Sequence, residues 1–517
     1  MFRKPDLSTC SLAVACLGAF ALSAAAQQAP SKDFVPGQLI VGFKSPQDLD
    51  KAVGELKQAE QSGGLAARGA RSSSVGVERL SERSAKVSID FRSRSGAKLA
   101  EGAELEALEE YARLLAQDPK VEYAHPNWIL QLHRERRADA VYLEDLPPDT
   151  RVQTARATPA EPNDPYFRNG LLWHYMEPPY GMNAVGAWSK VKGDRTVVVA
   201  VLDSGLLPDH PDIKASGNVL KGYDFISDPI RKGDSTAAGR NADPTDRGDA
   251  CPPRVPRPSW HGSHVAGTVG AGAANNGFGI AGVNWQVSIL PVRVAGRCGG
   301  TIEDIAAAIR WAAGLDVPDV PKNERKADII NLSLGIRFEC RNAMVGVMAD
   351  AIAAARSAGT TIVASAGNDA IDIKSTSPAG CAGVISVAAS DMRGYLTPYS
   401  NFGNVTIMAP GGDLQRDDDA DNRPDGVWSL VAPTSEHPNG VAAYEGTSMA
   451  APHVTAAIAL ALQARPDLRG KPEEIQALLT RSVAPLPAGA CVKACGPGLL
   501  DAKQMVEPEV TTSSSKR

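Results

Sequence analysis

Several motifs that mark particular classes of protein are absent from this sequence. It has no His-Glu-x-x-His motif, which zinc peptidases carry on a helix, and no Gly-x-Ser-x-Gly motif, which α/β-hydrolases place on a sharp turn. Lys and Arg form no basic stripe, and the net charge is only −5 over 517 residues. We therefore expect no nucleic-acid partner and neither of those two types of hydrolase.

The amino terminus carries the features of a secretory signal. A basic start at residues 1–4 is followed by a short apolar run at 11–21 and by small residues at 23–27. The run is too short to anchor a helix in a bilayer, and no later stretch is suited to spanning one. We expect residues 1–26 to be removed. The mature chain should then be secreted without a membrane anchor, through the periplasm if the organism is Gram-negative.

Six cysteines remain once Cys10 and Cys16 leave with the signal. An even number in an exported chain indicates disulfides. Metal ligation is the alternative, but the spacings are wide and no Cys-x-x-Cys pair is present. Six cysteines allow 15 pairings. We expect pairing in sequence order, with the last pair closing a very short loop: Cys251–Cys298, Cys340–Cys381 and Cys491–Cys495.

Residues 446–453, Gly-Thr-Ser-Met-Ala-Ala-Pro-His, join a small-residue turn to an apolar helix expected at about 449–462. Pro452 fits the first turn of such a helix, where its missing N–H costs nothing. Ser448 would lie at the helix N-terminus, where N–H groups and the helix dipole favour developing negative charge. That position suits a nucleophile, although most serines that precede a helix only cap it.

Two upstream stretches favour the interpretation of Ser448 as a nucleophile over that of a helix cap. Residues 197–203 form a buried, parallel-type strand that ends in Asp203 and a glycine turn. Residues 261–269 begin with His261 and continue as a small-residue helix. Open α/β sheets place their chemistry at the carboxyl ends of strands, and a serine hydroxyl needs a neighbouring base.

The order Asp203, His261, Ser448 within these motifs resembles the subtilisin family of serine proteases over about residues 160–505. The resemblance implies that His261 acts as base and then acid, while Asp203 holds the imidazole. It also implies an α/β fold, with a mostly parallel sheet covered by helices on both faces. Protein or peptide substrates and a monomeric enzyme are expected.

The resemblance extends to residues around the reacting bond. A strand ending in Gly-Asn at 362–369 matches the family's oxyanion asparagine, so Asn368 should donate to the oxyanion beside the Ser448 N–H. Alone, Asn368 would be read as a turn residue. Two segments match those that flank the specificity pocket, and an ordinary buried strand remains compatible with each: Ser333, Leu334 and Gly335, and Ala364, Ser365, Ala366 and Gly367.

Residues 27–132 read as a small α+β unit, with strands at 38–43 and 86–91 and helical spacing from Leu105 to Leu115. The Gly/Ser/Ala-rich residues 61–75 are expected to form a surface loop. The unit resembles the inhibitory propeptide of subtilisin-like proteases, and an independent binding domain is the alternative.

We interpret the remaining segments from their composition. Residues 133–160 are charged and aperiodic, and they are expected to be a linker in which self-cleavage occurs near 158–162. Residues 161–507 should form the catalytic domain, and 508–517 a disordered tail.

Calcium is the expected cofactor. Residues 162–167 resemble the mature start of thermitase-like members of the family, whose strong calcium site would here use Asp164, Asp212, the Asn276 side chain and the carbonyls of Phe278 and Ile280. Carboxylates mixed with carbonyls suit calcium. A second cluster, which could also be a solvated acidic loop, consists of Asp243, Asp246 and Asp249. A third run, at 417–426, has alternate carboxylates but lacks the glycine and final glutamate of an EF-hand.

The sequence therefore predicts a secreted serine endopeptidase, made as a zymogen that processes itself. The alternatives are a catalytically inactive, calcium-binding extracellular protein with a protease-like fold, and a calcium-dependent adhesin. Neither alternative requires all four of Asp203, His261, Ser448 and Asn368.

Overall fold

The computed structural model describes residues 33–61, 66–67, 70–93, 97–132, 141–142, 161–233, 239–253 and 255–507. The chain divides into two units, 1–32 and 33–517, and all described residues belong to the second. The expected signal peptide, nearly all of the expected linker and the expected tail lie outside the described residues.

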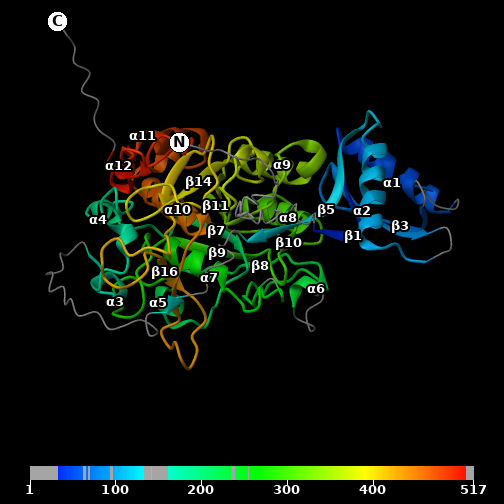
Figure 1. Cartoon of the computed structure of the whole chain (residues 1–517). Coiled ribbons are helices and arrows are strands. Elements are labelled where there is room, and N and C mark those ends of the chain that lie inside the picture. Colours follow the sequence, from blue (N-terminus) through cyan, green and yellow to red (C-terminus); the bar gives the residue numbers. More distant parts are fainter. Residues whose placement is uncertain are drawn as a thin grey trace, which may run out of the picture. The chain divides into compact units, whose positions relative to one another are not determined.

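Residues 33–132 form an antiparallel sheet with two helices (Figure 1). The strands follow the order β5-β1-β4-β3-β2. Leu108, Tyr111 and Ala112 of α2 are buried, as their helical spacing predicts. This part of the chain is the expected α+β unit, and its elements are β1 (Phe34–Phe43), α1 (Pro46–Gln61), β2 (Ala66–Ala67), β3 (Ala70–Arg79), β4 (Ser84–Ser93), α2 (Glu101–Leu115) and β5 (Val121–Leu132).

The loop expected at residues 61–75 is only partly a loop. Ala66–Ala67 and the start of β3 lie within it and pair with each other, and β3 continues along β4. Small residues such as Ser and Ala carry little strand signal. Their backbone groups nevertheless complete the ladder, so the prediction was wrong for this stretch.

The rest of the chain is built on a nine-stranded sheet of order β18-β19-β15-β14-β13-β11-β7-β9-β8. Every pairing in it is parallel except that of β18 with β19. Its strands are β7 (Val198–Asp203), β8 (Tyr223–Asp224), β9 (Ser288–Arg293), β11 (Ile329–Leu332), β13 (Thr361–Ser365), β14 (Ile385–Ser390), β15 (Ile407–Pro410), β18 (Val483–Ala484) and β19 (Leu499–Leu500).

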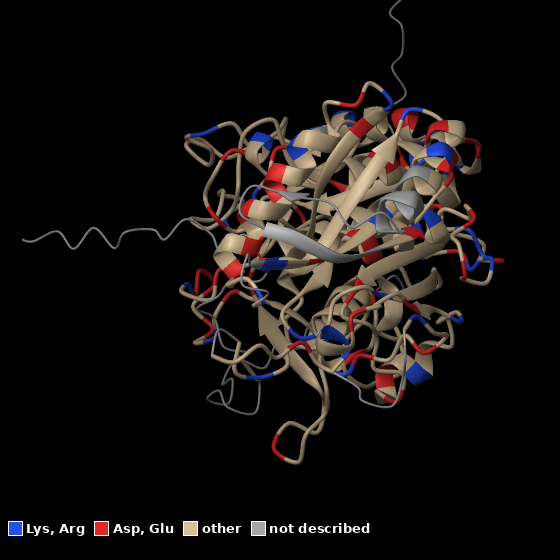
Figure 2. Ribbon diagram, turned by 90° about the vertical axis from the view of Figure 1, so that its right-hand side faces the viewer, with Lys and Arg blue, Asp and Glu red and all other residues tan. Residues whose placement is uncertain are grey.

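Helices cover both faces of this sheet, as expected. Successive residues of a strand point to opposite faces, and β7 illustrates the result. Val198, Ala200 and Leu202 belong to a core cluster with α8 (Ile302–Ala312) and α9 (Asn342–Ser357). Val199 and Val201 belong to a second cluster with α7 (His261–Ala266) and α10 (Thr447–Ala464). Figure 2 shows that charged residues lie mainly on helices and loops, away from the central strands.

Short elements complete this part of the chain. The helices are α3 (Pro165–Arg168), α4 (Ala184–Trp188), α5 (Pro211–Ser216), α6 (Pro229–Lys232), α11 (Pro472–Arg481) and α12 (Ala502–Val506). Within the described residues, no helix is both long and apolar enough to cross a membrane.

Short strands bring distant segments together in two sheets. The end of β5 pairs with β10 (Gly300–Thr301) and with β12 (Leu334–Gly335), both antiparallel, so that the first sheet has seven strands. A separate three-stranded sheet joins β16 (Val427–Leu430), β17 (Val441–Tyr444) and β6 (Val141–Tyr142). Both sheets adjoin the residues predicted to act in catalysis.

Candidate active site

Asp203 and His261 are in direct contact. Asp203 is the last residue of β7, and His261 is the first residue of α7. The Nδ1–H of His261 donates to Oδ1 of Asp203 over 2.8 Å, and both side chains are 0% exposed. A second donor to the same oxygen is the backbone N–H of Ser204, at 2.7 Å. Nε2 of His261 has no hydrogen-bond partner among the described residues, so this nitrogen is left to accept a proton.

The loop after Asp203 ties β7 to α7. Ser204 Oγ donates to Oδ2 of Asp246 over 2.6 Å, and it accepts a hydrogen bond from the N–H of Gly262 over 2.9 Å. Gly262 is the residue after His261. The chain of contacts therefore fixes the start of α7, and with it His261, against the end of β7.

Ser448 is the second residue of α10, so it does not cap the helix. The residue before the helix is Gly446, which has no side chain to act as a cap. The hydroxyl of Ser448 instead donates to the carbonyl of Ser333 over 3.2 Å, and the hydroxyl of Ser333 donates to the carbonyl of Ser448 over 3.1 Å. These reciprocal bonds hold the start of α10 against the segment that follows β11.

Asn368 contacts the residue that precedes Ser448. Its Oδ1 accepts from the N–H of Thr447 over 2.9 Å and from the Thr447 hydroxyl over 2.8 Å. The N–H of Gly367 donates to the same hydroxyl over 3.0 Å. Because these bonds engage Oδ1, the amide orientation is set, and Nδ2 is the group with which Asn368 can donate.

The positions of these residues follow from the sheet. β13, β11 and β7 are neighbours in that order and run parallel. Asn368 follows β13, Ser333 follows β11, and Asp203 ends β7. All three therefore lie along the carboxyl edge of one sheet, where open α/β folds place their sites.

The two segments predicted to flank the specificity pocket are buried, and both contact the start of α10. Ser333 contacts Ser448, and Gly367 contacts Thr447. Leu334 and Gly335 form β12, whose partner is the end of β5. Ala364 and Ser365 end β13, and Ala366 follows them.

One wall of the site was not predicted. Ile129 and Leu130 of β5 pair with Thr301 and Gly300 of β10. A strand of two residues that begins with glycine carries no alternation, so the sequence offered no signal for it. β12 pairs with β5 on its other side. The end of β5 therefore lies in a slot between β10 and β12 that is one strand wide.

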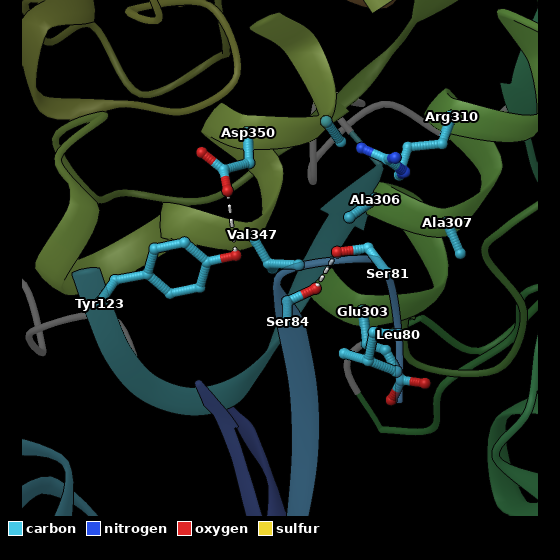
Figure 3. A pocket seen from close by; sticks show the side chains of 11 residues that line it. Leu80, Ser81, Ser84, Tyr123, Glu303, Ala306, Ala307, Arg310, Val347 and Asp350 are labelled. Carbon is cyan, nitrogen blue, oxygen red and sulfur yellow. Dashed lines mark hydrogen bonds between the residues drawn. The ribbon is translucent and has the colours of Figure 1, made fainter. Parts of the chain in front are cut away.

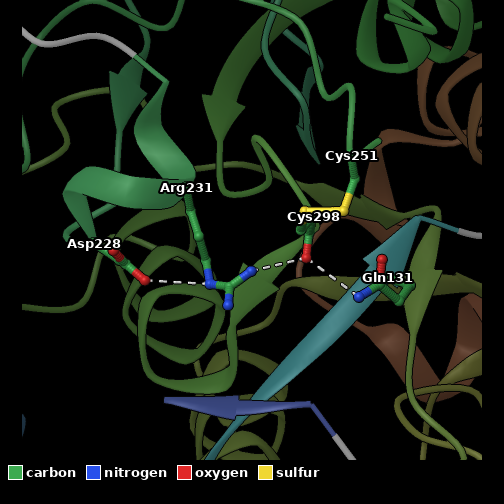
Figure 4. The surroundings of a disulfide bond; sticks show 5 residues. All are labelled: Gln131, Asp228, Arg231, Cys251 and Cys298. Atoms are coloured by element: carbon green, nitrogen blue, oxygen red, sulfur yellow. Dashed lines mark hydrogen bonds and ion pairs between the residues drawn. A yellow bond between two sulfur atoms is a disulfide. The ribbon is translucent and has the colours of Figure 1, made fainter. Parts of the chain in front are cut away.

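The three disulfides form in the expected order, Cys251–Cys298, Cys340–Cys381 and Cys491–Cys495. The first lies beside the slot (Figure 4). The carbonyl of Cys298 accepts from Nη1 of Arg231 over 2.9 Å and from Nε2 of Gln131, in β5, over 3.2 Å. Gly299 follows at a φ of 96°, and a Cβ there would lie 2.1 Å from the carbonyl of Leu130. The turn into β10 therefore needs glycine.

Hydrogen bonds connect Asp164, Asp212 and Asn276 of the first candidate calcium site. Asp164 and Asp212 are fully buried. Asp164 accepts from the N–H of Asn276 over 3.2 Å, and Asp212 Oδ1 accepts from Nδ2 of Asn276 over 2.7 Å. Asp212 Oδ2 accepts from the N–H of Ile280 over 3.0 Å. Burial raises the pKa of both carboxyls, that of Asp212 to about 7.

The surrounding loop packs closely on Asp212. Gly279 has a φ of 58°, and a Cβ there would lie 2.4 Å from Oδ2 of Asp212. Phe278 lies in the same turn, where its N–H donates to Oδ1 of Asn276 over 2.8 Å. Two buried carboxylates beside a tight loop are a setting that suits calcium, which prefers carboxylate and carbonyl oxygens.

The second predicted cluster is not gathered. Asp243 pairs with Arg247 over 2.6 Å, Asp246 binds Ser204, and Asp249 accepts from the hydroxyl of Ser259 over 2.7 Å. Each carboxylate thus has a different partner, and that of Asp246 lies in the loop after β7.

Three acidic side chains of the third run do lie close together. Oxygen atoms of Asp417, Asp419 and Asp425 come within 4.8 Å of one another. Both oxygens of Asp417 accept backbone N–H groups of the same loop, those of Asp421 and Asn422, over 2.9 Å.

A pocket lies between residues 33–132, here called the N-terminal unit, and the helices α8 and α9 (Figure 3). Tyr123 and Ser84 line it from the N-terminal unit, and Glu303 and Asp350 line it from the two helices. The Tyr123 hydroxyl donates to Oδ2 of Asp350 over 3.4 Å. Polar contacts therefore join the unit to the helices around this pocket.

Comparison with protein families gives two matches. The model of the Subtilase family matches residues 194–498, and that of the Fervidolysin N-terminal prodomain matches residues 21–64. The first match contains Asp203, His261, Asn368 and Ser448. The second overlaps the described residues from β1 onward.

Three similar proteins agree with these matches. An extracellular protease of Xanthomonas campestris is 38% identical over 72% of this chain and 62% of its own length. An extracellular basic protease of Dichelobacter nodosus is 37% identical over 67% of this chain and 56% of its own length. The chain thus spans about three fifths of these relatives. A solved protease structure from Pseudoalteromonas arctica is 41% identical, has a TM-score of 0.59, and covers 67% of this chain and 98% of its own.

Proposed function

Because this chain belongs to the subtilase family, we propose that it is an exported serine endopeptidase in which Ser448, His261 and Asp203 act together. The observation that supports this most directly is the 2.8 Å hydrogen bond between buried His261 and Asp203 at the carboxyl edge of the sheet. The names of the extracellular relatives agree with export.

The proton transfers follow from the site. In the first step, Ser448 Oγ attacks the carbonyl carbon of the peptide, and Nε2 of His261 takes its proton. The Nδ1–H bond to Asp203 keeps the correct tautomer before this step and stabilises the imidazolium after it. His261 then returns the proton to the leaving amine, and water releases the acyl group in a second round.

The negative charge on the carbonyl oxygen needs donors that are already in place. We assign this role to Nδ2 of Asn368 and the backbone N–H of Ser448, supported by the N-terminus of α10. The two bonds from Thr447 to Oδ1 of Asn368 hold that amide before substrate arrives.

Ser448→Ala provides the test of this function. The folded variant should lose hydrolysis of a peptide amide, and only the residual rate that binding and oxyanion donors supply, roughly 10³–10⁴ over water, should remain. Circular dichroism of both proteins checks the fold. A folded variant with substantial activity would exclude Ser448 as the nucleophile.

We also propose that residues 33–132 inhibit the enzyme by occupying its cleft. The end of β5 fills the slot between β10 and β12, with Leu132 opposite Leu334, the residue after Ser333. An extended strand paired on both sides is the form in which a substrate would bind. The cleavage site expected near residues 158–162 lies outside the described residues.

Self-processing can be tested with the purified precursors. The wild type should lose residues 33–132 and begin near 158–162, whereas Ser448→Ala should stay uncut after signal removal. Amino-terminal sequencing of both decides the matter. Maturation of purified Ser448→Ala without another protease would show that processing is not intramolecular chemistry of Ser448.

Calcium is proposed as a stabilising ion held by Asp164, Asp212, Asn276 and the carbonyls of Phe278 and Ile280. The support is the burial of both carboxylates and the close packing of the loop at Gly279. A cation there would neutralise two buried charges and tie residues 163–166 to the loop at 275–280. It would support the fold near α5 and take no part in the reaction.

A further inference from the structure

The catalytic domain holds a short segment of its own chain as an added strand. β6, Val141–Tyr142, is the edge strand of the sheet β16-β17-β6 and runs antiparallel to β17. The ring of Tyr142 stacks on the imidazole of His437, with centroids 3.7 Å apart and planes 8° from parallel. This segment lies between the N-terminal unit and the catalytic domain, in the stretch expected to leave on maturation.

β17 leads directly to the nucleophile. The strand ends at Tyr444, and α10, which carries Ser448, begins at Thr447. In β6, Val141 lies opposite Ala443 and Tyr142 lies opposite Ala442. Because β17 runs toward Ser448, the antiparallel β6 runs away from it.

The same stretch of chain enters the slot first and reaches β17 afterwards. Leu132 lies opposite Leu334, and Ser333, the residue before Leu334, is hydrogen-bonded to Ser448. Nine positions later, Val141 begins the strand along β17. An extended chain spans at most about 30 Å over nine residues, so a polypeptide that leaves the slot can reach this edge.

We propose that the edge of β17, together with His437, is a second binding site for protein substrates. It would take the part of a substrate that leaves the slot, with an aromatic side chain stacked on His437 nine or ten residues beyond the residue in the position of Leu132, which we take as the residue before the substrate's scissile bond. This inference rests on the proposed endopeptidase function. In the precursor, β6 occupies the site, and its direction is the direction that a substrate would take.

The chemistry of the site suits an extended peptide. When β6 leaves, β17 becomes an edge strand with unpaired main-chain groups, which recognise a peptide backbone of any sequence. The small side chains of Ala442 and Ala443 are buried and allow the close approach. The aromatic ring on His437 adds selectivity.

The loop between β16 and β17 holds His437 in position. The N–H of His437 donates to Oγ1 of Thr434 over 2.9 Å, and the N–H of Thr434 donates to the carbonyl of His437 over 3.1 Å. The N–H of Gly440 donates to the same carbonyl over 3.2 Å. These bonds lie within the hairpin, so they persist when β6 departs.

Three peptide substrates of the mature wild-type enzyme test the proposal. All three have the same sequence before the scissile bond. The short peptide ends four residues after it, and the two long peptides extend twelve residues, with either Tyr-Tyr or Ala-Ala at the ninth and tenth positions. We expect kcat/KM of the Tyr-Tyr peptide to exceed that of the Ala-Ala peptide by about fivefold, the worth of one aromatic pair. The Ala-Ala peptide should still exceed the short one through backbone pairing.

His437→Ala should abolish the Tyr-Tyr advantage, whereas Glu436→Ala, an exposed neighbour in the same loop, should retain it. A Tyr-Tyr peptide with N-methyl groups on the amides of the ninth and tenth residues tests the strand pairing without changing the enzyme, and it should lose the gain over the short peptide.

Equal kcat/KM for all three peptides would overturn the proposal, as would an unchanged Tyr-Tyr advantage in His437→Ala. Retention of residues 141–142 in the active mature chain would contradict it too, because the edge would then stay filled. Hydrolysis of the short peptide by the wild type reports separately on the proposed endopeptidase function, so failure of the two ideas can be told apart.

Discussion

Lys86 of the N-terminal unit places its Nζ 3.2 Å from Oε1 of Glu303, the second residue of α8. The Glu303 side chain is 1% exposed and also pairs with Arg240 over 3.1 Å. Asn127 of β5 donates from its Nδ2 to Oε2 of Glu303 over 3.2 Å. One buried carboxylate of the catalytic domain thus accepts two side chains of the proposed inhibitor.

Lys86→Met should weaken the hold of the inhibitory unit. Removing one partner of a buried ion pair leaves the other charge uncompensated. Because Arg240 still contacts Glu303, we expect a loss of about 1–3 kcal/mol rather than the full cost of an isolated buried charge. The lag before purified precursor develops peptidase activity should shorten about tenfold. Lys44→Met, at an exposed position of the same unit, is the control, and an equal lag in both variants would contradict the role of Lys86.

The Asn368→Asp variant distinguishes the proposed donor, Nδ2 of Asn368, from the hydrogen bonds that Oδ1 accepts from Thr447. The aspartate keeps an oxygen that can accept from Thr447 but loses the Nδ2 donor. We expect kcat to fall by about 10²–10³ or more, as for removal of an oxyanion donor, with little change in thermal stability. Asn368→Ala should lose activity to a similar degree and stability as well. If Asn368→Asp retained more than a tenth of the wild-type kcat, Asn368 would not be an oxyanion donor.

Chelation should destabilise the enzyme through the site at Asp212. Calcium at a hundredfold excess over its dissociation constant adds about 2.7 kcal/mol to the stability of the folded state. We expect the melting temperature of inhibitor-blocked enzyme to drop by several degrees when calcium is removed. Asp212→Asn should abolish this response, and Asp243→Asn, in a different loop, should preserve it. Identical melting curves with and without calcium would contradict the proposed calcium site.

Several histidines are buried in the neutral form, and their contribution to stability should be lost in mild acid. Burial lowers the pKa of His264 to about 3 and the pKa values of His453 and His125 to about 4. Nδ1 of His174 contacts Nε2 of His453 over 2.8 Å, and burial also lowers the pKa of His174. A depressed folded pKa contributes stability that is present above the unfolded pKa of about 6.5 and is lost as pH falls.

Denaturant unfolding of the Ser448→Ala precursor between pH 7.5 and pH 4.5 measures this effect. Each extra proton bound on unfolding costs about 1.4 kcal/mol per pH unit. Buried carboxyls with raised pKa values, such as Asp212 and Asp246, act in the opposite direction, so the comparison is made with a His174→Gln precursor. Below about pH 6.5 the His174→Gln precursor should gain stability relative to the precursor that keeps His174. Parallel stability profiles of the two proteins over this range would show that His174 does not titrate on unfolding.

The sequence predicted the parts of the site that depend on residue type. Asp203, His261 and Ser448 each stand in a motif whose strand or helix is evident from apolar periodicity, and the structure places them on those elements. Ser333 and Gly367 were expected near the pocket, and the structure shows how each holds the start of α10.

The sequence could not reveal contacts made by backbone groups alone. β10 and β6 are strands of two residues, too short to show any alternation, and their partners lie far away in the chain. The three carboxylates Asp243, Asp246 and Asp249 show the opposite problem. Their spacing suggested one site, but each carboxylate bonds to a different donor, and the tertiary structure determines which donor is within reach.

A fluorophosphonate probe applied to mature wild type, followed by mass spectrometry of the labelled peptide, tests the central claim most directly. The phosphonyl group reports a serine that a neighbouring base has activated. The account predicts one label, on Ser448, that is absent from folded Ser448→Ala and strongly slowed in His261→Ala. A correctly folded mature wild type that stayed unlabelled, or that carried the label on another residue, would contradict it.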